Sequence, residues 1–558
     1  MRSPEKAVAA ASGICPVSAV CRRMMMRGGA CAVAIVLLLL GAARCATTPD
    51  PVASSSGATT FDRDTTSSGP TTRAPAPDGR GWVTSSAGHE SEPEPLVPWA
   101  EDRPAPPPPL AMLAGVQAPH IFRYAFPNGL HLVVVERRRR PIVETQVVFE
   151  FGSTSDPKTT PGATFFSIAA LGGLREEDEN GDHVGGEEPF SRQVWDKGGH
   201  YRFNVASDYS TVGILGYAQD AREHMEMLYR AIARPRCGIQ TFEARRNDLI
   251  YGLEDLELND EEAFYRFLSQ ASFGVEHVYA RPVYGTLTTL KRIVFENVIA
   301  HQRKILRPDG ATLLVVGDVR AEDVIRWAGG TFGAWSTTSS RPIVRVPPVS
   351  NARKQRVLII PRPTARSMAI CATRAIASQE HGEATLDMLA AVLGGGMNSR
   401  LGVALRARTG LSYSFFADVA ERRHGRALIA CTRVRKEDTD EALAKFLESM
   451  KGLLESPPTV EETDRARATE LAEVETEFEG IERSLSTLVH GISLGRVEAP
   501  AKRIEALKGI GPKEVHRAAL ALLDPSEIQI LLAGEVSAAR RAAAANRLDV
   551  PKVVSLVE

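Results

Sequence analysis

Pro161-Gly-Ala-Thr-Phe-Phe-Ser-Ile-Ala-Ala170 is the stretch from which the organisation of this 558-residue chain can be read. Pro161 and Gly162 break the preceding loop, and the mostly apolar run behind them predicts the start of a buried helix. The run carries Phe165, Ile168 and Ala169, whose side chains hold no nitrogen or oxygen with which to bind a metal or accept a proton. We therefore expect these side chains to pack in a core.

The composition is that of a globular protein with several domains. A length of 558 residues exceeds the usual size of one domain. Lys and Arg number 67 against 68 Asp and Glu, so the net charge of -1 gives no reason to expect nucleic-acid binding. None of the seven cysteines is part of a C-x-x-C pair, which indicates neither a zinc ribbon nor a thioredoxin-like redox site.

The N-terminus has the pattern of an export signal. Arginines precede the apolar run Cys31–Ala43, which is too short to cross a bilayer, so residues 1–45 are predicted to be a signal peptide. Its end resembles a bacterial lipoprotein cleavage site with Cys45 as the lipidated residue, and ordinary cleavage near Ala43 without a lipid is the alternative. We expect an exported protein of a bacterial cell envelope or periplasm, anchored to a membrane through this lipid.

Residues 46–115 are rich in Thr, Ser, Pro, Gly and Asp. Such a segment cannot bury enough apolar surface to fold, and it is predicted to be a disordered tether. The folded part begins with two predicted strands, Leu130–Val135 and Ile142–Phe151, joined by a polar hairpin tip. The tip contains Arg137–Arg140, which either binds an anionic partner or is a solvated loop; its shortness favours the loop.

The folded part repeats. Ala311–Val319 and Ile528–Val536 are each an apolar strand followed by a Gly-acid turn and a helix. Gly317 and Gly534 of these segments are 217 residues apart, and two helix ends, at Gly172 and Gly394, are 222 apart. Near-equal offsets indicate a duplicated domain. We predict an α+β fold in which homologous domains at 116–338 and 353–558, joined by a linker at 339–352, each contain a sheet covered by helices.

Two segments of the second half resemble the pitrilysin/insulinase family of zinc metallopeptidases. Leu393-Gly-Gly-Gly-Met-Asn-Ser-Arg-Leu401 and Leu405-Arg-Ala-Arg-Thr-Gly-Leu-Ser-Tyr-Ser414 are similar to the family's G-G-x-x-S-R-L and L-R-x-x-x-G-L-x-Y-S patterns. The resemblance implies mainly antiparallel sheets, and implies that Arg406 and Tyr413 hold a substrate backbone. A fixed cation and a phenol hydroxyl both donate to a peptide carbonyl. The alternative is that Arg406 caps a helix and Tyr413 packs at a strand start.

The resemblance also implies that the catalytic residues are missing. In the family motif G-x-x-H-x-x-E-H, two histidines bind zinc and the glutamate activates water. Aligned on Gly162, these positions fall on Phe165, Ile168 and Ala169, and the third ligand, a glutamate, falls on Tyr251 or Gly252. We expect no catalytic residue and no zinc in this chain.

Two further segments contain candidate binding residues. The segment ending in Asn204 resembles the family's G-G-x-x-N-A-x-T strand, which implies that Asn204 meets a substrate, while local backbone bonding is the alternative. Glu176–Glu187 departs at two positions from the calcium-loop pattern, and an acidic solvated insertion is favoured over a calcium site.

The resemblance implies a paired enzyme. In such pairs, as in mitochondrial processing peptidase, one subunit carries zinc and the other has lost the motif. This chain resembles the second type, so we expect a related zinc-bearing peptidase subunit as partner and extended peptides as substrates. A structural scaffold without peptidase function is the alternative, and an autonomous hydrolase with a rebuilt metal site is a third possibility.

Overall fold

The computed structural model describes residues 120–173, 190–233, 235, 239–257, 260–337, 339–350, 356–362, 365–377, 381–496 and 500–554. The predicted signal peptide with Cys45, the predicted tether and the acidic segment Glu176–Glu187 lie outside these residues, so those predictions stay predictions. No helix among the described residues is long and apolar enough to cross a membrane.

The first half of the chain is built on a six-stranded sheet in the order β1-β2-β6-β3-β5-β4. Only the β2–β6 pair is parallel. The strands are rich in β-branched residues, which suit a pleated surface buried on both faces. Their bounds are β1 Ile121–Ala125, β2 His131–Glu136, β3 Ile142–Phe149, β4 His200–Val205, β5 Ser210–Tyr217 and β6 Ala311–Gly317.

The second half repeats this sheet in the order β12-β7-β11-β8-β10-β9. The β7–β11 and β7–β12 pairs are parallel and the others antiparallel. The bounds are β7 Val357–Pro361, β8 Ser367–Ile376, β9 Ser412–Arg422, β10 Gly425–Arg435, β11 Gln529–Gly534 and β12 Lys552–Val553. The predicted fold class, α+β with two mainly antiparallel sheets covered by helices, is confirmed.

Gly317 and Gly534 occupy equivalent places at the ends of β6 and β11. Their φ angles are 151° and 153°, a region that favours glycine. A Cβ on Gly317 would clash with the Ile142 carbonyl oxygen, and one on Gly534 would clash with the Met368 sulfur. The glycines that marked the repeat in sequence are therefore required where each central strand turns towards its next helix.

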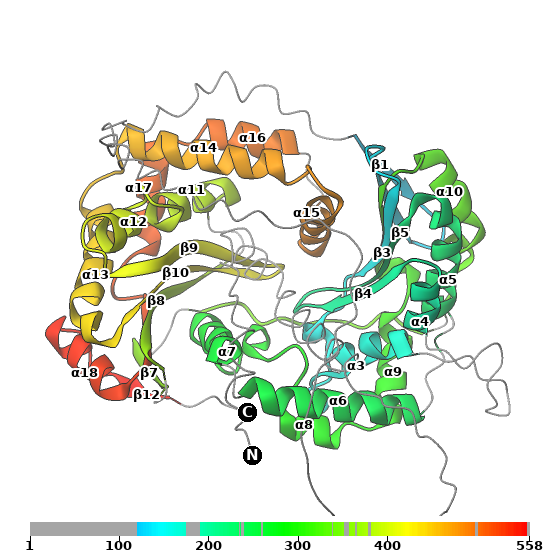
Figure 1. Ribbon diagram of the computed structural model, residues 1–558, viewed down its shortest axis with the longest axis horizontal. Coiled ribbons are helices and arrows are strands. Elements are labelled where there is room, and N and C mark those ends of the chain that lie inside the picture. The colour runs from blue at the N-terminus through cyan, green and yellow to red at the C-terminus, as the bar shows by residue number, and fades with distance from the viewer. Residues whose placement is uncertain are drawn as a thin grey trace, which may run out of the picture.

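Helices cover the outer face of each sheet (Figure 1). The helices of the first half are α3 Ala163–Ala169, α4 Phe190–Asp196, α5 Ala221–Ala233, α6 Ile239–Glu257, α7 Asp260–Phe273, α8 Leu287–Arg292, α9 Phe295–Ile305 and α10 Ala321–Gly330. Those of the second half are α11 Glu383–Gly394, α12 Arg400–Gly402, α13 Thr439–Glu455, α14 Val460–Thr476, α15 Ile481–Ser493, α16 Pro500–Lys508, α17 Pro512–Leu522 and α18 Val536–Ala545. All but α7 and α15 lie on the outer side of their own sheet.

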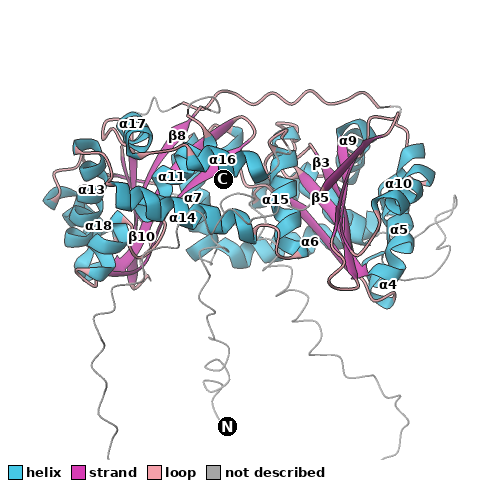
Figure 2. Cartoon of the chain, turned by 90° about the horizontal axis from the view of Figure 1, so that it is seen from above, coloured by secondary structure: helices cyan, strands magenta, loops and turns pink. Residues whose placement is uncertain are grey.

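One helix of each half packs on the sheet of the other half. Phe267, Leu268 and Ala271 of α7 pack on Cys371 and Ile429 of the second sheet. In return, α15 covers the inner face of the first sheet with Leu485, Leu488, Val489 and Ile492, against Val133, Val135, Val148, Leu314 and Val316. Figures 1 and 2 both place α7 and α15 between the two sheets. This exchange buries apolar area across the boundary, so the halves hold together through a hydrophobic interface.

Two local features differ from the sequence interpretation. The loop Arg137–Arg140 is not a hairpin tip, because β6 lies between β2 and β3; Glu136 and Val143 both pair with Gly317. The hairpin prediction was wrong because adjacency along the chain was taken for adjacency in the sheet. A cross-strand disulfide joins Cys371 to Cys431 on β8 and β10, 60 residues apart, and sequence spacing gave no sign of it.

Candidate functional site

Helix α3 is the place where the family resemblance puts the zinc motif, and the structure fills it with hydrocarbon. Phe165, Ile168 and Ala169 are 1%, 0% and 8% exposed. The Phe165 ring packs edge-on against Phe203 of β4 and Tyr284, with centroids 6.1 and 6.3 Å away. Burial of these side chains stabilises the helix by roughly 1.5–3 kcal/mol for each large one.

The start of α3 is held by buried polar groups. The Asp156 carboxylate accepts hydrogen bonds from the Gly162 and Thr164 backbone N–H groups at 2.7 and 2.8 Å. The Thr164 hydroxyl lies 2.8 Å from Nε2 of His301 on α9. Burial raises the pKa of Asp156 to about 7 and lowers that of His301 to about 4. These groups cap the helix and leave no exposed base.

Zinc does not fit the residues that are present. Gly252 is buried in α6 and offers no donor, while the neighbouring Tyr251 is exposed. No group of three or more His, Cys, Asp or Glu side chains that could hold a metal ion occurs among the described residues. A catalytic zinc requires about three protein ligands, so we assign no metal chemistry to this part of the chain.

Arg406 and Tyr413 are brought together by the second half. Arg406 lies in the π-helical turn η9, Val403–Ala407, which ends before β9 begins. Its guanidinium carbon sits 4.3 Å from the centre of the Tyr413 ring. Tyr413 is 78% exposed, so its hydroxyl points into solvent rather than into a core. The stacked pair is a fixed cation beside a free phenol.

A bulge explains why Tyr413 faces outward. Arg433 of β10 pairs with Ser414, and the next residue, Val434, pairs with Ser412. Tyr413 is thus the extra residue on β9, and a bulge re-aims the side chain it carries. The Ser412 hydroxyl fixes the bulge by donating to the carbonyls of Ser414 and Arg433 at 2.9 and 2.8 Å.

Asn204 lies apart from this pair, on the other sheet. It is part of β4, which like β9 is the outermost strand of its sheet among the described residues. Its side chain is partly buried, and its Oδ1 has no hydrogen-bond partner. Burial raises the pKa of Tyr209 to about 12, and a hydrogen bond from the Asn204 side chain partly opposes this.

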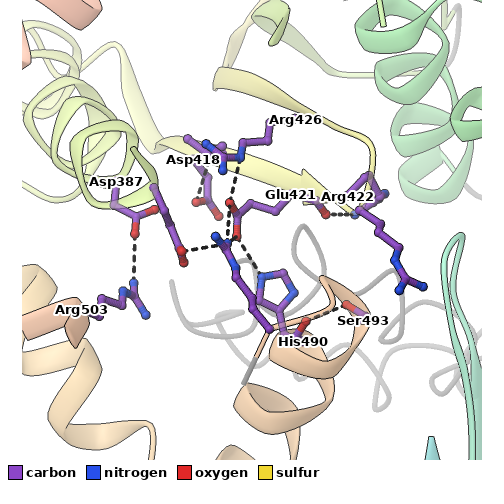
Figure 3. Close-up of polar contacts among 12 residues, drawn as sticks. Asp387, Asp418, Glu421, Arg422, Arg426, His490, Ser493 and Arg503 are labelled. Carbon is purple, nitrogen blue, oxygen red and sulfur yellow. Dashed lines mark hydrogen bonds and ion pairs between the residues drawn. The ribbon is translucent and has the colours of Figure 1, made fainter. Parts of the chain in front are cut away.

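A polar cluster between β9 and α15 was not found from the sequence (Figure 3). The buried Glu421 of β9 accepts from Arg426 at 3.2 Å and lies 3.0 Å from Nε2 of His490 on α15. Arg496 bridges Glu421, at 3.4 Å, to Glu383 of α11, at 2.7 Å. The cluster therefore ties the helix that covers the first sheet to the core of the second half.

A second part of the cluster surrounds Arg503 of α16. Its guanidinium lies 3.1 Å from Asp387, 3.7 Å from Glu470 and 2.5 Å from Glu477. These carboxylates outweigh burial and hold the pKa of Arg503 above its usual value. Burial and the charge of Glu421 raise the pKa of Glu383 to about 7. The acid Asp387, four residues after Glu383 in a mostly apolar helix, was the sequence signal for this cluster.

The turn between β9 and β10 joins the two halves through hydrogen bonds. The Asp208 carboxylate accepts from the Arg423 backbone N–H at 2.9 Å and from the Tyr279 hydroxyl at 3.0 Å. The Tyr279 oxygen accepts in turn from the His424 backbone N–H at 3.0 Å. Burial, reinforced by Asp208, raises the pKa of Tyr279. Asp208 and Tyr279 belong to the first half and the turn belongs to the second, so these hydrogen bonds cross the boundary between the halves.

Comparison with known proteins supports the family resemblance. Residues 292–470 match the family described as peptidase M16 inactive domain. An uncharacterized zinc protease of Streptomyces coelicolor is 25% identical over 172 residues, which cover 30% of this chain. The match spans 37% of that protein, little more than a third of its length. The predicted resemblance to this family of zinc metallopeptidases is confirmed.

Solved structures show the same fold. A peptidase M16 inactive domain from Pseudomonas fluorescens superposes with a TM-score of 0.65 at 17% identity, covering 75% of this chain and 98% of the other. A protease from Helicobacter pylori gives 0.65 at 15% identity over 75% of this chain and 100% of its own. A chain of complex III₂ from Candida albicans, bound to Inz-5, gives 0.64 at 12% identity, with 78% and 100% covered.

Proposed function

We propose, from the premise that this chain contains a peptidase M16 inactive domain over residues 292–470, that it is the non-catalytic, peptide-gripping subunit of an exported two-subunit zinc metallopeptidase. A related zinc-bearing subunit supplies the metal-activated water. This chain helps close the chamber and holds the peptide.

The observation that carries this proposal is the burial of α3. The positions at which family members present two histidines and a glutamate are here Phe165, Ala169 and Ile168, all packed in the core. A core made of hydrocarbon cannot coordinate zinc without a change of several side chains. The fold has been kept while its chemistry has been lost, which favours a helper role.

The pair formed by the half-buried Arg406 and the exposed Tyr413 supports peptide gripping. It lies beside β9, and Asn204 lies on β4, so each half offers an outer strand. An extended peptide adds to such a strand through main-chain hydrogen bonds. Arg406 and Tyr413 would donate to its carbonyls, with no need for a metal in this subunit.

Two features support export and anchoring. The sequence before the folded part has the pattern of a signal peptide and a tether, with Cys45 as the lipidation candidate. The Cys371–Cys431 disulfide is typical of proteins that fold in an oxidising compartment.

A pull-down from the cell envelope tests the proposal. The tagged chain should retain a zinc peptidase, and zinc in the eluate should track the partner and not this chain. Arg406→Ala combined with Tyr413→Phe should lower the cleavage rate of the pair while leaving its assembly intact. Peptide hydrolysis by the isolated chain, abolished by a chelator, would overturn the assignment.

A scaffold role is the second candidate. It is favoured by the contacts between the two halves, because a rigid body suits assembly. These contacts are the packing of α7 and α15 on the opposite sheets and the hydrogen bond between Asp208 and the Arg423 backbone N–H. A scaffold would retain no zinc peptidase, and changing Arg406 together with Tyr413 would leave every associated activity unchanged. The same pull-down therefore separates the two roles.

A further inference from the structure

The loop Arg137–Arg140 gathers positive charge at one end of the first sheet. It crosses over the end of β6, where the Arg137 backbone N–H donates to the Gly317 carbonyl at 2.7 Å. The arginines that follow, Arg138, Arg139 and Arg140, are all exposed. Four consecutive arginines repel one another, and the charge of Arg139 adds to burial in lowering the pKa of Arg137. Such a loop is stabilised by an anionic partner.

The carboxylates nearby neutralise only part of the charge of this loop. Glu136 pairs with Arg138 at 2.8 Å and also accepts from the Ala321 backbone N–H at the start of α10. The negative charge of Glu479, in the second half, opposes the lowering of the pKa of Arg137. The guanidinium groups of Arg139 and Arg140 have no ion-pair or hydrogen-bond partner among the described residues, although the Arg140 carbonyl accepts from the Ile142 backbone N–H at 2.8 Å. Their guanidinium groups are thus free to bind phosphate oxygens in a bidentate manner.

Exposed aromatic side chains continue the surface. Tyr217 is the last residue of β5 and is 54% exposed. It pairs with Ile142, which follows Arg140 by two residues. A Cβ on Gly198 would lie 3.4 Å from the Tyr217 ring, which places the α4–β4 turn beside it. Trp195 precedes that turn and is 58% exposed. Trp and Tyr are the residues that favour the interface between water and lipid.

The N-terminal segment joins the fold at the same end. In the β1–β2 pair, Ile121 lies opposite Val135, so His120 is next to Glu136 and the arginine loop. His120, the described residue that follows the N-terminal segment, therefore lies beside this surface. A membrane anchor at the far end of that segment and a basic surface at its near end would act on the same bilayer.

We propose that the surface formed by Arg138, Arg139, Arg140, Tyr217 and Trp195 docks the first half on an anionic lipid bilayer. The arginines bind phosphodiester headgroups, and the aromatic rings enter the interface. A basic patch strengthens the attachment of a lipid-anchored protein to a bilayer, and this surface supplies a basic patch whether or not a lipid is attached. The inference goes beyond the proposed function and does not depend on Cys45 carrying a lipid.

Vesicle sedimentation tests the inference with the chain from residue 46 onward, which lacks the apolar segment and Cys45 but holds every described element. The probe is a vesicle of equal parts phosphatidylglycerol and phosphatidylcholine, with pure phosphatidylcholine as reference. We expect binding to the anionic vesicle only, at about 0.1 M salt, and its loss near 1 M, where charges are screened within about 3 Å. Arg138→Gln, Arg139→Gln and Arg140→Gln combined should weaken binding about 100-fold, at about fivefold per arginine.

A matched control removes three positive charges from exposed positions of α17 and α18 through Lys513→Gln, Arg517→Gln and Arg540→Gln. It should bind as the unchanged chain does. Trp195→Phe should abolish the blue shift in tryptophan emission that vesicles induce. The inference is overturned if the unchanged chain does not sediment with anionic vesicles, or if the loop variant and the control bind equally. Circular dichroism of each variant confirms that the fold is retained.

Discussion

The Arg406 guanidinium carbon lies 4.3 Å from the centre of the Tyr413 ring, so that the π-helical turn before β9 is stacked on the bulged residue of that strand. A cation over an aromatic face is stabilised by roughly 0.5–1 kcal/mol at an exposed site. The contact reduces the freedom of both side chains, and a peptide that binds there finds them already in place.

Removing either member of this pair should weaken peptide binding more than it weakens the fold. Arg406→Ala removes the guanidinium and Tyr413→Phe removes the phenol hydroxyl; each hydrogen bond lost to the peptide is worth roughly 0.5–1.5 kcal/mol, so we expect up to about tenfold weaker binding for one lost bond. The free energy of unfolding should change by less than about 1 kcal/mol because Tyr413 is mostly exposed. Fluorescence anisotropy with an extended peptide, and urea unfolding, measure the two effects.

Two exposed residues outside the pair serve as controls for that experiment. Arg408→Ala changes the same turn, and Tyr251→Phe changes an exposed phenol on α6. Both should leave peptide affinity unchanged. If either control weakens binding as much as Arg406→Ala does, the pair is not the peptide contact.

Restoring the family motif should not restore the enzyme. The triple variant Phe165→His, Ile168→Glu and Ala169→His places polar groups in an apolar core, where Phe165 now packs against Phe203 and Tyr284. Burying unpaired polar and charged groups costs several kcal/mol, so we expect loss of the native fold instead of zinc binding. Circular dichroism and zinc analysis measure the outcome, with Ile168→Val, costing about 0.5–1.5 kcal/mol, as the tolerated control. A folded triple variant with stoichiometric zinc would contradict this expectation.

Glu144 should make stability fall as pH rises. Burial on β3, reinforced by Glu482 and opposed by Arg202, raises the pKa of Glu144 to about 7. Between its ordinary pKa of 4.5 and about 7, the folded chain holds a proton that the unfolded chain has released. The free energy of unfolding therefore declines through that window and levels off above it. Glu144→Gln should make the decline shallower by up to about 1.4 kcal/mol per pH unit, measured by urea unfolding.

Other groups titrate in the same window, so the comparison is between variants at each pH. The raised pKa of Glu383 acts in the same direction. His301 acts oppositely, because its pKa is lowered to about 4 and the stability it contributes is lost as pH falls from 6.5 through that value. Glu461→Gln, at an exposed position of α14, should not alter the pH dependence. An unaltered slope in Glu144→Gln would mean that this carboxyl is ionised in the fold.

The Cys371–Cys431 disulfide should stabilise the second half. It joins neighbouring strands 60 residues apart, and constraining a loop of that length in the unfolded chain is worth roughly 2–4 kcal/mol. Cys371→Ala with Cys431→Ala should lower the unfolding free energy by that amount, and a reductant should have no further effect on the variant's stability through this pair. Mass spectrometry after alkylation checks the bond directly. Alkylation of both thiols in the unreduced, unfolded chain would show that the bond is absent.

Local patterns predicted much of the fold. The strands that became β2 and β3, the glycine-ended strands β6 and β11 and the duplication were all visible because apolar periodicity and turn residues act over a few neighbours. The prediction of a hairpin at Arg137–Arg140 was wrong because β6, which lies between β2 and β3, comes from residues far along the chain. The Glu421–His490 contact joins residues 69 apart, and no periodicity reports such a pair.

The sequence by itself determined what this protein lacks: donors on the helix at Phe165, Ile168 and Ala169, since side-chain chemistry is fixed by residue identity. Only the tertiary structure decided that α7 packs on the second sheet and α15 on the first. It also decided that Cys371 bonds to Cys431, and that the loop Arg137–Arg140 lies beside His120, where the N-terminal segment ends. These outcomes depend on the pairing of distant strands and on burial of apolar faces against whichever surface remains uncovered, a choice made by the whole chain at once.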